Sequence, residues 1–406
     1  MHVVLLNQFY PPARAPTGKL LHDLACVLDE HGHQVTVITS AGIYGGSEAS
    51  PAEVNDASKI RIDRLGPSAG HGQTVIRKLI DYLSFFPRAH RCLCQLDPQP
   101  DVVVVMTTPP FCASIARRYQ RRTGVPYVIW NMDLYPEALA ANRMLRSHNP
   151  LYQLLYRRAA RERNDAIRVI SLGADMTHLI VQSAPTARVV EVPVWSKLAP
   201  DDASLAAAER LRSRRGWHPE ECIFMYSGNI GRAHRMEEFG ALAEAIAKEN
   251  LPARVVISGD GPSKARWQRH AAGARIEWID PVADADVVAH LLSADVHLIS
   301  QEPAWQGVVV PSKYQAACAL GRPVLFAGPE TAAVAEWIRQ DDTGWIILPG
   351  QQEPLTIVRE AIQNKSLLRD KGWRAREQAQ RLFERSASCR VVISLLEEIA
   401  GAKHDD

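Results

Sequence analysis

The sequence predicts an α/β fold of two doubly wound domains, each built on a parallel sheet. The 406 residues exceed the size of one ordinary α/β domain, and short β-branched runs alternate with helical stretches along the chain. A Pro- and Asp-containing connector, Pro193 to Asp202, separates two such series. Ligand sites of doubly wound domains lie at the carboxyl ends of the strands. We therefore expect domains at 1–195 and 200–385 that face each other across a cleft.

The apolar runs predict the individual strands. In the first domain they are Val3–Leu6, Val35–Thr39, Val102–Met106, Tyr127–Trp130, Ala166–Ile170 and Val189–Val192. In the second domain they are Ile223–Tyr226, Arg254–Ser258, Arg275–Ile279, Val296–Ile299, Pro323–Phe326 and Trp345–Ile347. The last apolar stretch, around Val391–Ile399, predicts a helix within 386–406 that we expect to pack back on the first domain.

Composition and missing motifs exclude several classes of protein. Apolar residues make up 46% and charged residues 23%, as in chains that fold throughout. Seven cysteines without zinc spacing are typical of reduced cytosolic thiols, so we expect no metal site. The absence of G-x-G-x-x-G and P-loop patterns argues against a dinucleotide dehydrogenase or an NTPase, and no nucleic-acid module accompanies the basic residues.

We expect neither a signal peptide nor a membrane-spanning segment in this chain. Met1 leads directly into the first strand, and no apolar stretch reaches 18 residues, so membrane contact would be peripheral. The stretch Arg77 to Arg91 mixes apolar side chains with Arg77, Lys78, Arg88 and Arg91. It could lie on an anionic membrane, or form a helix whose apolar face covers the domain core. Both readings stay open.

One candidate anion site follows the first strand. Thr17-Gly18 precedes the amphipathic stretch Lys19–Glu30, and a helix amino terminus with a glycine favours a diphosphate close to the backbone. Thr17 could equally serve as the helix N-cap, and both roles are compatible.

The second domain offers further phosphate-binding loops. Gly228 and Asn229 follow a predicted strand, and Arg232 and Arg235 could neutralise a leaving diphosphate, although solvated arginines are the alternative. The other loop candidates at strand ends and helix starts are Gly259, Gly261, Ser312 and Lys313.

These residues carry a resemblance to family-4 glycosyltransferases of the GT-B fold, which pairs two Rossmann-like domains. It rests on Gly18 with Gly32-His33-Gln34-Val35, Tyr226-Ser227-Gly228-Asn229, Gly259-Asp260-Gly261-Pro262 and Gly321-Arg322-Pro323-Val324. Asp133-Leu134-Tyr135-Pro136-Glu137 and Pro311-Ser312-Lys313 resemble the branch that builds bacterial surface polysaccharides, including colanic-acid and N-acetylfucosamine transferases.

The resemblance implies a retaining hexosyltransferase that uses a UDP- or GDP-sugar, needs no metal or other cofactor, and works in the cytoplasm. Its acceptor would be polyprenyl-diphosphate-linked or a glycan. The protein itself could bind peripherally to the inner face of the cell membrane. Carried over to this chain, Gly18 lies beside the diphosphate, while Arg232, Arg235 and Lys313 stabilise it. The implied catalytic residues are Asp133, Arg232 and Lys313, and the acceptor residues are Tyr10, Asp133 and Glu137.

Two positions depart from the family pattern. The family carries two glutamates eight residues apart, the second holding the donor ribose, where this chain has Val308 and Ala316. Asp133 stands near the place of a family histidine, where it could accept a proton, hold a sugar hydroxyl or cap a helix. The departures leave two alternatives open, a non-catalytic protein that binds a sugar nucleotide and a sugar-nucleotide 2-epimerase.

Overall fold

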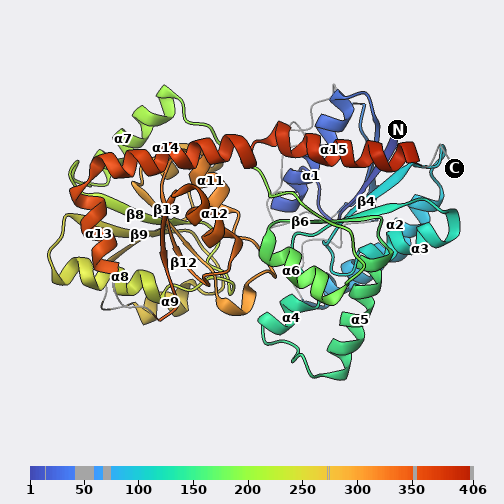
Figure 1. The fold of residues 1–406 in the computed structure, drawn as a ribbon, viewed down its shortest axis with the longest axis horizontal. Coiled ribbons are helices and arrows are strands. Elements are labelled where there is room, and N and C mark those ends of the chain that lie inside the picture. The colour runs from blue at the N-terminus through green and yellow to red at the C-terminus, as the bar shows by residue number, and fades with distance from the viewer. Residues whose placement is uncertain are drawn as a thin grey trace. The chain divides into compact units, whose positions relative to one another are not determined.

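The computed structural model describes residues 1–13, 15–41, 59–66, 75–271, 273, 275–350 and 354–402. The chain forms two compact units (Figure 1), one of Met1–Pro193 with Arg385–Asp406 and one of Val194–Glu384. Each unit contains one sheet in which every strand pair is parallel, with helices on both sides (Figure 1). The prediction of two parallel-sheet α/β domains is confirmed.

The sheet of the first unit has seven strands in the order β3-β2-β1-β4-β5-β6-β7. They are β1 His2–Leu6, β2 Gln34–Ser40, β3 Arg61–Leu65, β4 Val102–Met106, β5 Tyr127–Trp130, β6 Arg168–Ser171 and β7 Val189–Glu191. All six predicted strands occur within two residues of their expected bounds. The sequence analysis missed β3, because this edge strand is only half-buried and reads Arg-Ile-Asp-Arg-Leu, without an apolar run.

The helices of the first unit bury regularly spaced apolar side chains against this sheet. They are α1 Pro16–Glu30, α2 Val75–Cys94, α3 Ala113–Thr123, α4 Glu137–Ala141, α5 Pro150–Asp165, α6 Ala174–Ser183 and α15 Arg385–Ala402. The N-cap of α1 is Ala15, with Pro16 in the first helical position, so the reading of Thr17 as N-cap is wrong. Proline suits this position because its missing N–H would have no partner there.

The terminal helix α15 belongs to the first unit, although the chain reaches it only after the second unit. It contacts α1 and β4, Glu398 forms an ion pair with Arg168 (3.0 Å), and Glu397 accepts a hydrogen bond from Nε2 of His33 (3.1 Å). Buried residues Val392, Leu396 and Ile399 supply its apolar face.

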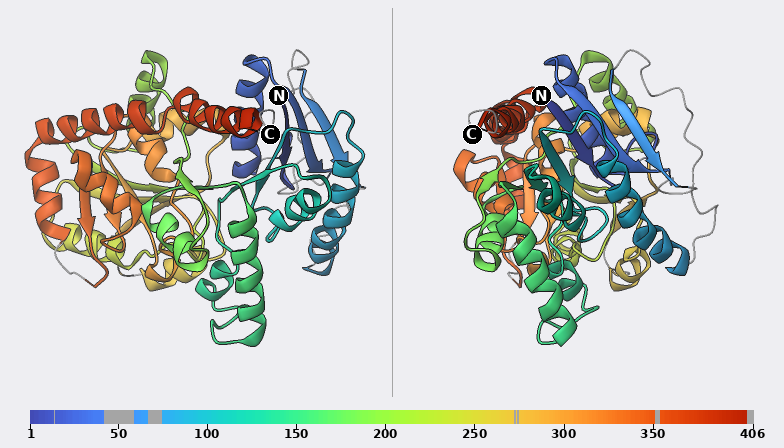
Figure 2. Two further views of the ribbon diagram at one scale, coloured as in Figure 1. Left: turned by 45° about the vertical axis from the view of Figure 1, so that its right-hand side comes forward. Right: turned by 90° about the vertical axis from the view of Figure 1, so that its right-hand side faces the viewer.

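The sheet of the second unit has six strands in the order β10-β9-β8-β11-β12-β13. They are β8 Cys222–Ser227, β9 Ala253–Ser258, β10 Ile276–Ile279, β11 Val296–Ser300, β12 Val324–Ala327 and β13 Gly344–Ile347, as predicted to within one residue. The helices are α7 Asp202–Arg214, α8 Glu237–Lys248, α9 Lys264–His270, α10 Val287–Leu292, α11 Lys313–Ala319, α12 Ala333–Asp341, α13 Pro354–Gln363 and α14 Lys365–Leu382. Two further views of both units are given in Figure 2.

The basic stretch Arg77 to Arg91 lies in α2. The side chains of Arg77 and Lys78 lie outside the described residues. In the rest of the helix Phe85, Ala89 and Leu93 are buried, whereas Leu83 and Arg91 are exposed. This half of α2 therefore packs an apolar face on the unit, as the second reading expects. Within the described ranges, no helix combines the length and the hydropathy needed to cross a membrane.

Candidate functional site

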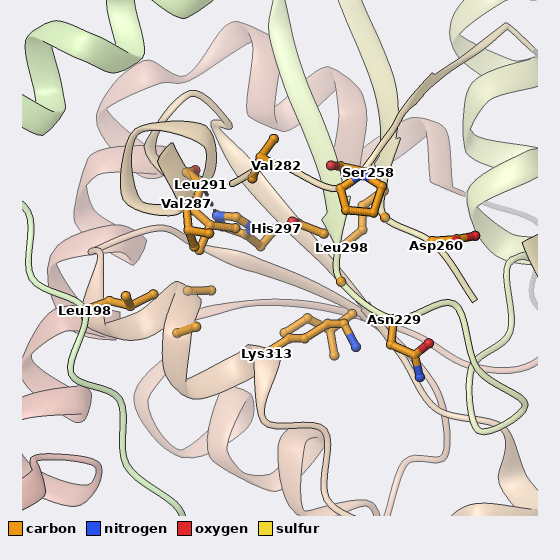
Figure 3. A pocket seen from close by; sticks show the side chains of 17 residues that line it. Leu198, Asn229, Ser258, Asp260, Val282, Val287, Leu291, His297, Leu298 and Lys313 are labelled. Carbon is orange, nitrogen blue, oxygen red and sulfur yellow. Dashed lines mark hydrogen bonds between the residues drawn. The ribbon is translucent and has the colours of Figure 1, made fainter. Parts of the chain in front are cut away.

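A cavity of about 460 Å³ opens in the second unit at the carboxyl ends of β8, β9 and β11, which are neighbours in the sheet. Figure 3 shows Lys313 and Asn229 on one side of it, and Val287 and Leu291 of α10 on the other. Its volume is that of a typical small-molecule site. Of the predicted donor-binding residues, Gly228, Asn229, Gly259 and Lys313 line this cavity.

Glycine is required at the cavity because two loops approach each other there through their backbones. Gly228 and Gly259 have φ angles of 132° and 137°, which side-chain-bearing residues rarely adopt. A Cβ atom on Gly259 would overlap the carbonyl oxygen of Gly228, and one on Gly228 would lie 2.7 Å from Cε of Lys313. In the neighbouring turn, a Cβ on Gly261 would lie 2.6 Å from the carbonyl oxygen of Ile230. The glycines thus bring backbone and Lys313 together at one end of the cavity.

Lys313 is a cation held at the glycine loops. Its Nζ donates to Nε2 of His234 (3.2 Å) and lies 5.0 Å from the ring centre of Tyr226, within cation–π range. Across the described ranges, no Asp or Glu side chain forms an ion pair with it. Burial lowers the pKa of Lys313 to about 8, so the amine still carries its proton at neutral pH. An anion in the cavity would supply the missing counter-charge.

His234 is a contact of Lys313 that the sequence analysis did not single out. Its Nδ1 donates to the carbonyl oxygen of Ser300 (2.9 Å), which leaves Nε2 as the acceptor for Lys313. Burial, reinforced by the charge of Lys313, lowers the pKa of His234 to about 4, so the ring is neutral. The only sequence signal was a histidine between Arg232 and Arg235 in the glycine loop. The neutral ring orients the amine without competing with it for an anion.

The other predicted donor-binding residues of this unit do not line the cavity. Arg232 is exposed, and it has no ion-pair partner in the part of the chain that the structure describes. Arg235 is paired with Glu238 (2.8 Å), and Glu302 lies 3.7 Å away. These carboxylates balance its charge, so the geometry favours a role in joining the loop to α8. Gly261 shapes the adjacent turn, and Ser312 is exposed just ahead of α11.

Asp133, the candidate base in the first unit, follows β5. The backbone N–H groups of Met132 and Asp133 donate to Oγ1 of Thr107 (3.0 and 3.3 Å), which fixes the loop against the end of β4. Burial raises the pKa of Asp133 to about 6. Among the described side chains, none donates a hydrogen bond to its carboxylate. A carboxylate of this kind can accept a proton near neutral pH.

Two predicted acceptor residues have partners inside the first unit instead. The hydroxyl of Tyr10 lies 3.0 Å from Nδ1 of His22, and the side chain is buried. Glu137 accepts from Arg163 through both oxygens (2.9 and 3.3 Å), in an ion pair whose side chains are 11% and 5% exposed. The sequence could not reveal this pair, because α4 and α5 meet only in the folded unit.

Gly18 lies inside α1, where its own backbone neighbours explain the glycine. A Cβ on it would lie 3.0 Å from the carbonyl oxygen of Phe9 and 3.2 Å from Cα of Tyr10. Its N–H donates to the carbonyl oxygen of Ala15 (3.0 Å). We expected a diphosphate to lie close to the backbone at Gly18. The loop after β1 lies there instead.

The positions of the two family glutamates differ in their surroundings. Ala316 lines the cavity, whereas Val308 is buried outside it. A carboxylate is therefore missing at one point of the cavity wall. No group of three His, Cys, Asp or Glu side chains suited to a metal ion occurs within the described residues.

Two family models match the chain, one in each half. Residues 17–195 match the glycosyl transferase 4-like domain, and residues 221–363 match glycosyl transferases group 1. Two curated relatives are also described as glycosyltransferases. The chain is 24% identical to the probable glycosyltransferase WbjE of Pseudomonas aeruginosa over 64% of each protein, just under two thirds of that relative. It is 23% identical to the putative colanic acid biosynthesis glycosyl transferase WcaI of Escherichia coli K12, over 79% of this chain and 82% of WcaI.

Solved structures share the fold over nearly the whole chain. Sucrose-phosphate synthase from Thermosynechococcus elongatus superposes with a TM-score of 0.73 at 13% identity, covering 99% of this chain and 100% of that one. Anabaena HepE in complex with UDP-glucose gives a TM-score of 0.68 at 14% identity, covering 98% and 100%.

Proposed function

Since this chain belongs to the GT-B glycosyltransferases, we propose that it transfers a sugar from a UDP- or GDP-sugar to an acceptor. Its first half matches the glycosyl transferase 4-like domain, and its second half matches glycosyl transferases group 1. The acceptor is polyprenyl-diphosphate-linked or another glycan, and the product is part of a bacterial surface polysaccharide. The similarity to WcaI, a putative colanic acid biosynthesis glycosyl transferase, supports this part of the proposal. The transfer is of the hexosyl type and retains the configuration of the donor sugar.

The observation that carries this proposal is the cation at the glycine loops. Lys313 has no carboxylate within ion-pair distance among the described residues, and the backbones of Gly228 and Gly259 leave room beside it. A donor diphosphate would accept charge-assisted hydrogen bonds there, and these would strengthen as the glycosidic bond breaks and the leaving group gains charge. Arg232 lies in the same loop as Gly228 but outside the cavity lining, and in this proposal it contacts the diphosphate as a second cation. The UDP-glucose complex of HepE supports a nucleotide-sugar ligand for this fold.

Asp133 serves the acceptor in this proposal. Its pKa of about 6 leaves it mostly ionised at neutral pH yet close enough to exchange a proton with an attacking hydroxyl. The sugar itself becomes oxocarbenium-like, and no metal or other cofactor takes part. Transfer is therefore expected to survive EDTA.

The enzyme works in the cytoplasm, where it meets a lipid-linked acceptor at the inner face of the membrane. Exposed Leu83 and Arg91 of α2 offer that surface a contact. Co-sedimentation with anionic liposomes tests this, comparing the unaltered protein with a variant in which Arg77, Lys78, Arg88 and Arg91 are neutralised. Equal binding of the two proteins would reject membrane contact through α2.

The test of transfer uses the purified chain with UDP- and GDP-sugars and a polyprenyl-diphosphate-linked acceptor. We expect acceptor-dependent release of UDP or GDP, and NMR of the product should show the anomeric configuration of the donor sugar. Product of opposite configuration would overturn the retaining mechanism. Conversion of the donor without any acceptor would instead indicate a sugar-nucleotide 2-epimerase.

A non-catalytic protein that binds a sugar nucleotide is the second candidate. The observation that favours it is Ala316 in the cavity wall, at the place of the family's ribose-holding glutamate. Tight binding of a sugar nucleotide without release of UDP or GDP, over a panel of lipid-linked and soluble acceptors, would establish this alternative.

A further inference from the structure

His297 is a polar side chain in the apolar part of the cavity. It comes from β11, and Figure 3 shows it beside Val287, Leu291 and Leu298, which line the same cavity. The residue is 5% exposed. An imidazole at such a position is unfavourable compared with an aliphatic side chain unless its nitrogens are used.

One of its two ring nitrogens has a partner within the protein. Nε2 lies 3.1 Å from the carbonyl oxygen of Leu291, and because a carbonyl can only accept, Nε2 carries the hydrogen. Burial, followed by the nearby charge of Arg322, lowers the pKa of His297 to about 3, so the ring is neutral. Nδ1 is therefore an acceptor. Among the described residues, none donates a hydrogen bond to it.

The two ends of the cavity differ in chemistry, which orients a ligand in it. Lys313 and the backbones of Gly228 and Gly259 form a cationic end suited to phosphate, whereas Val282, Leu298 and α10 form an apolar end. A nucleoside diphosphate bound by its phosphates at Lys313 would place its nucleoside in the apolar end. His297 supplies an acceptor there.

We propose that Nδ1 of His297 accepts a hydrogen bond from the nucleoside of the donor, and that His297 thereby selects for nucleosides with a donor group at this point. The proposal rests on the proposed function. Two sources share the required chemistry, an N–H of the base, such as the imide of uracil or N1–H of guanine, and a ribose hydroxyl. Ala316, in the same cavity, cannot accept a hydrogen bond through its side chain, whereas His297 can.

Calorimetric titration of the full chain with UDP and with GDP tests the proposal. Substituting His297→Leu removes the acceptor, and leaving a buried donor of the ligand unpaired should weaken nucleotide binding roughly 5- to 100-fold. The matched control is His290→Leu, which removes another buried histidine of the same unit. His290 contacts Arg215 (3.3 Å) and does not line the cavity, so His290→Leu should bind as the unaltered protein does.

Modified ligands separate a direct hydrogen bond from a structural effect. For a uridine donor these are N3-methyl-UDP and 2′-deoxy-UDP, and for a guanosine donor N1-methyl-GDP and 2′-deoxy-GDP. The unaltered protein should bind one of the two modified ligands more weakly than the parent, and which one identifies base or ribose as the source. His297→Leu should bind the parent and that modified ligand equally, as in a double-mutant cycle.

Nucleotide affinity in His297→Leu equal to that of the unaltered protein would overturn this inference. So would a loss of affinity that is the same for every modified ligand, because that pattern indicates a packing defect. The proposed function would survive both results as long as the unaltered protein binds a nucleotide and transfers sugar. If the unaltered protein bound neither UDP nor GDP, the proposed function would fail and this inference with it.

Discussion

Substituting Lys313→Met should stabilise the protein and weaken nucleotide binding at the same time. Burial lowers the pKa of Lys313 from 10.5 to about 8, which corresponds to about 3 kcal/mol of cost for keeping the charge in the folded state. The unfolded chain binds the proton more tightly, so this cost is fully present below pH 8 and disappears as the pH rises towards 10.5. Methionine has similar length and no charge. We therefore expect the free energy of unfolding at pH 7 to rise by up to about 3 kcal/mol.

The same substitution removes the cation that faces the cavity. A charge about 4 Å from a phosphate, at an effective dielectric constant near 20, contributes about 4 kcal/mol, and loss of one preorganised donor typically costs about 3 kcal/mol. The dissociation constant for UDP or GDP should rise about 100-fold. Urea denaturation measures the first effect and isothermal titration calorimetry the second.

The control is Lys365→Met. Lys365 forms an ion pair with Glu220 (2.6 Å) in which both side chains are more than half exposed, so its loss should change stability by less than about 1 kcal/mol and leave nucleotide binding intact. Unchanged nucleotide affinity in Lys313→Met, or a decrease in its unfolding free energy, would refute the reasoning.

Four further outcomes are expected. Nucleotide affinity, measured by calorimetry from pH 6.5 to 9.5, should be level below pH 8 and fall by up to tenfold per pH unit above it, as Lys313 loses its proton; a level profile would count against a protonated Lys313. Asp133→Asn should lower the transfer rate at least 100-fold while raising stability at pH 7, because the ionised carboxylate, with its pKa raised to about 6, disfavours folding above that pH. Glu137→Gln breaks a buried ion pair with Arg163 and should lower the free energy of unfolding, measured by urea denaturation, by about 3 to 5 kcal/mol; unchanged stability would count against a structural role for this pair. Gly228→Ala, at φ 132° with its Cβ 2.7 Å from Cε of Lys313, should abolish nucleotide binding measured by calorimetry, and binding as tight as in the unaltered protein would contradict the proposed phosphate position.

Local patterns were enough to locate most of the fold. Val102–Met106 and Tyr127–Trp130 are apolar throughout because buried parallel strands contact helices on both faces, and the structure has these strands with the predicted bounds. The edge strand β3 escaped prediction because it is only half-buried and contains no apolar run. The start of α1 was placed three residues late, since Pro16 was not read as the first helical residue.

The sequence also located several residues of the cavity. Gly228 and Gly259 each follow a strand of the same sheet, so the parallel topology alone brings them to one edge. Lys313 was found through its position ahead of a helix and through the family motif around it. These inferences depend only on order along the chain and on the rule that parallel strands end at the same edge.

The tertiary structure alone decided which side chains are available to a ligand. Lys313 meets His234, 79 positions away, and has no carboxylate partner among the described residues, whereas Arg235 meets Glu302, which balances its charge. Glu137 is taken by Arg163 in the same way. Such pairings depend on how loops from distant strands pack together. The periodicity of a sequence predicts only which neighbouring positions are buried or exposed, so it cannot predict these pairings. For this protein the sequence therefore determined the two sheets and the edge where the cavity lies, and the packing of the loops determined which charges face it.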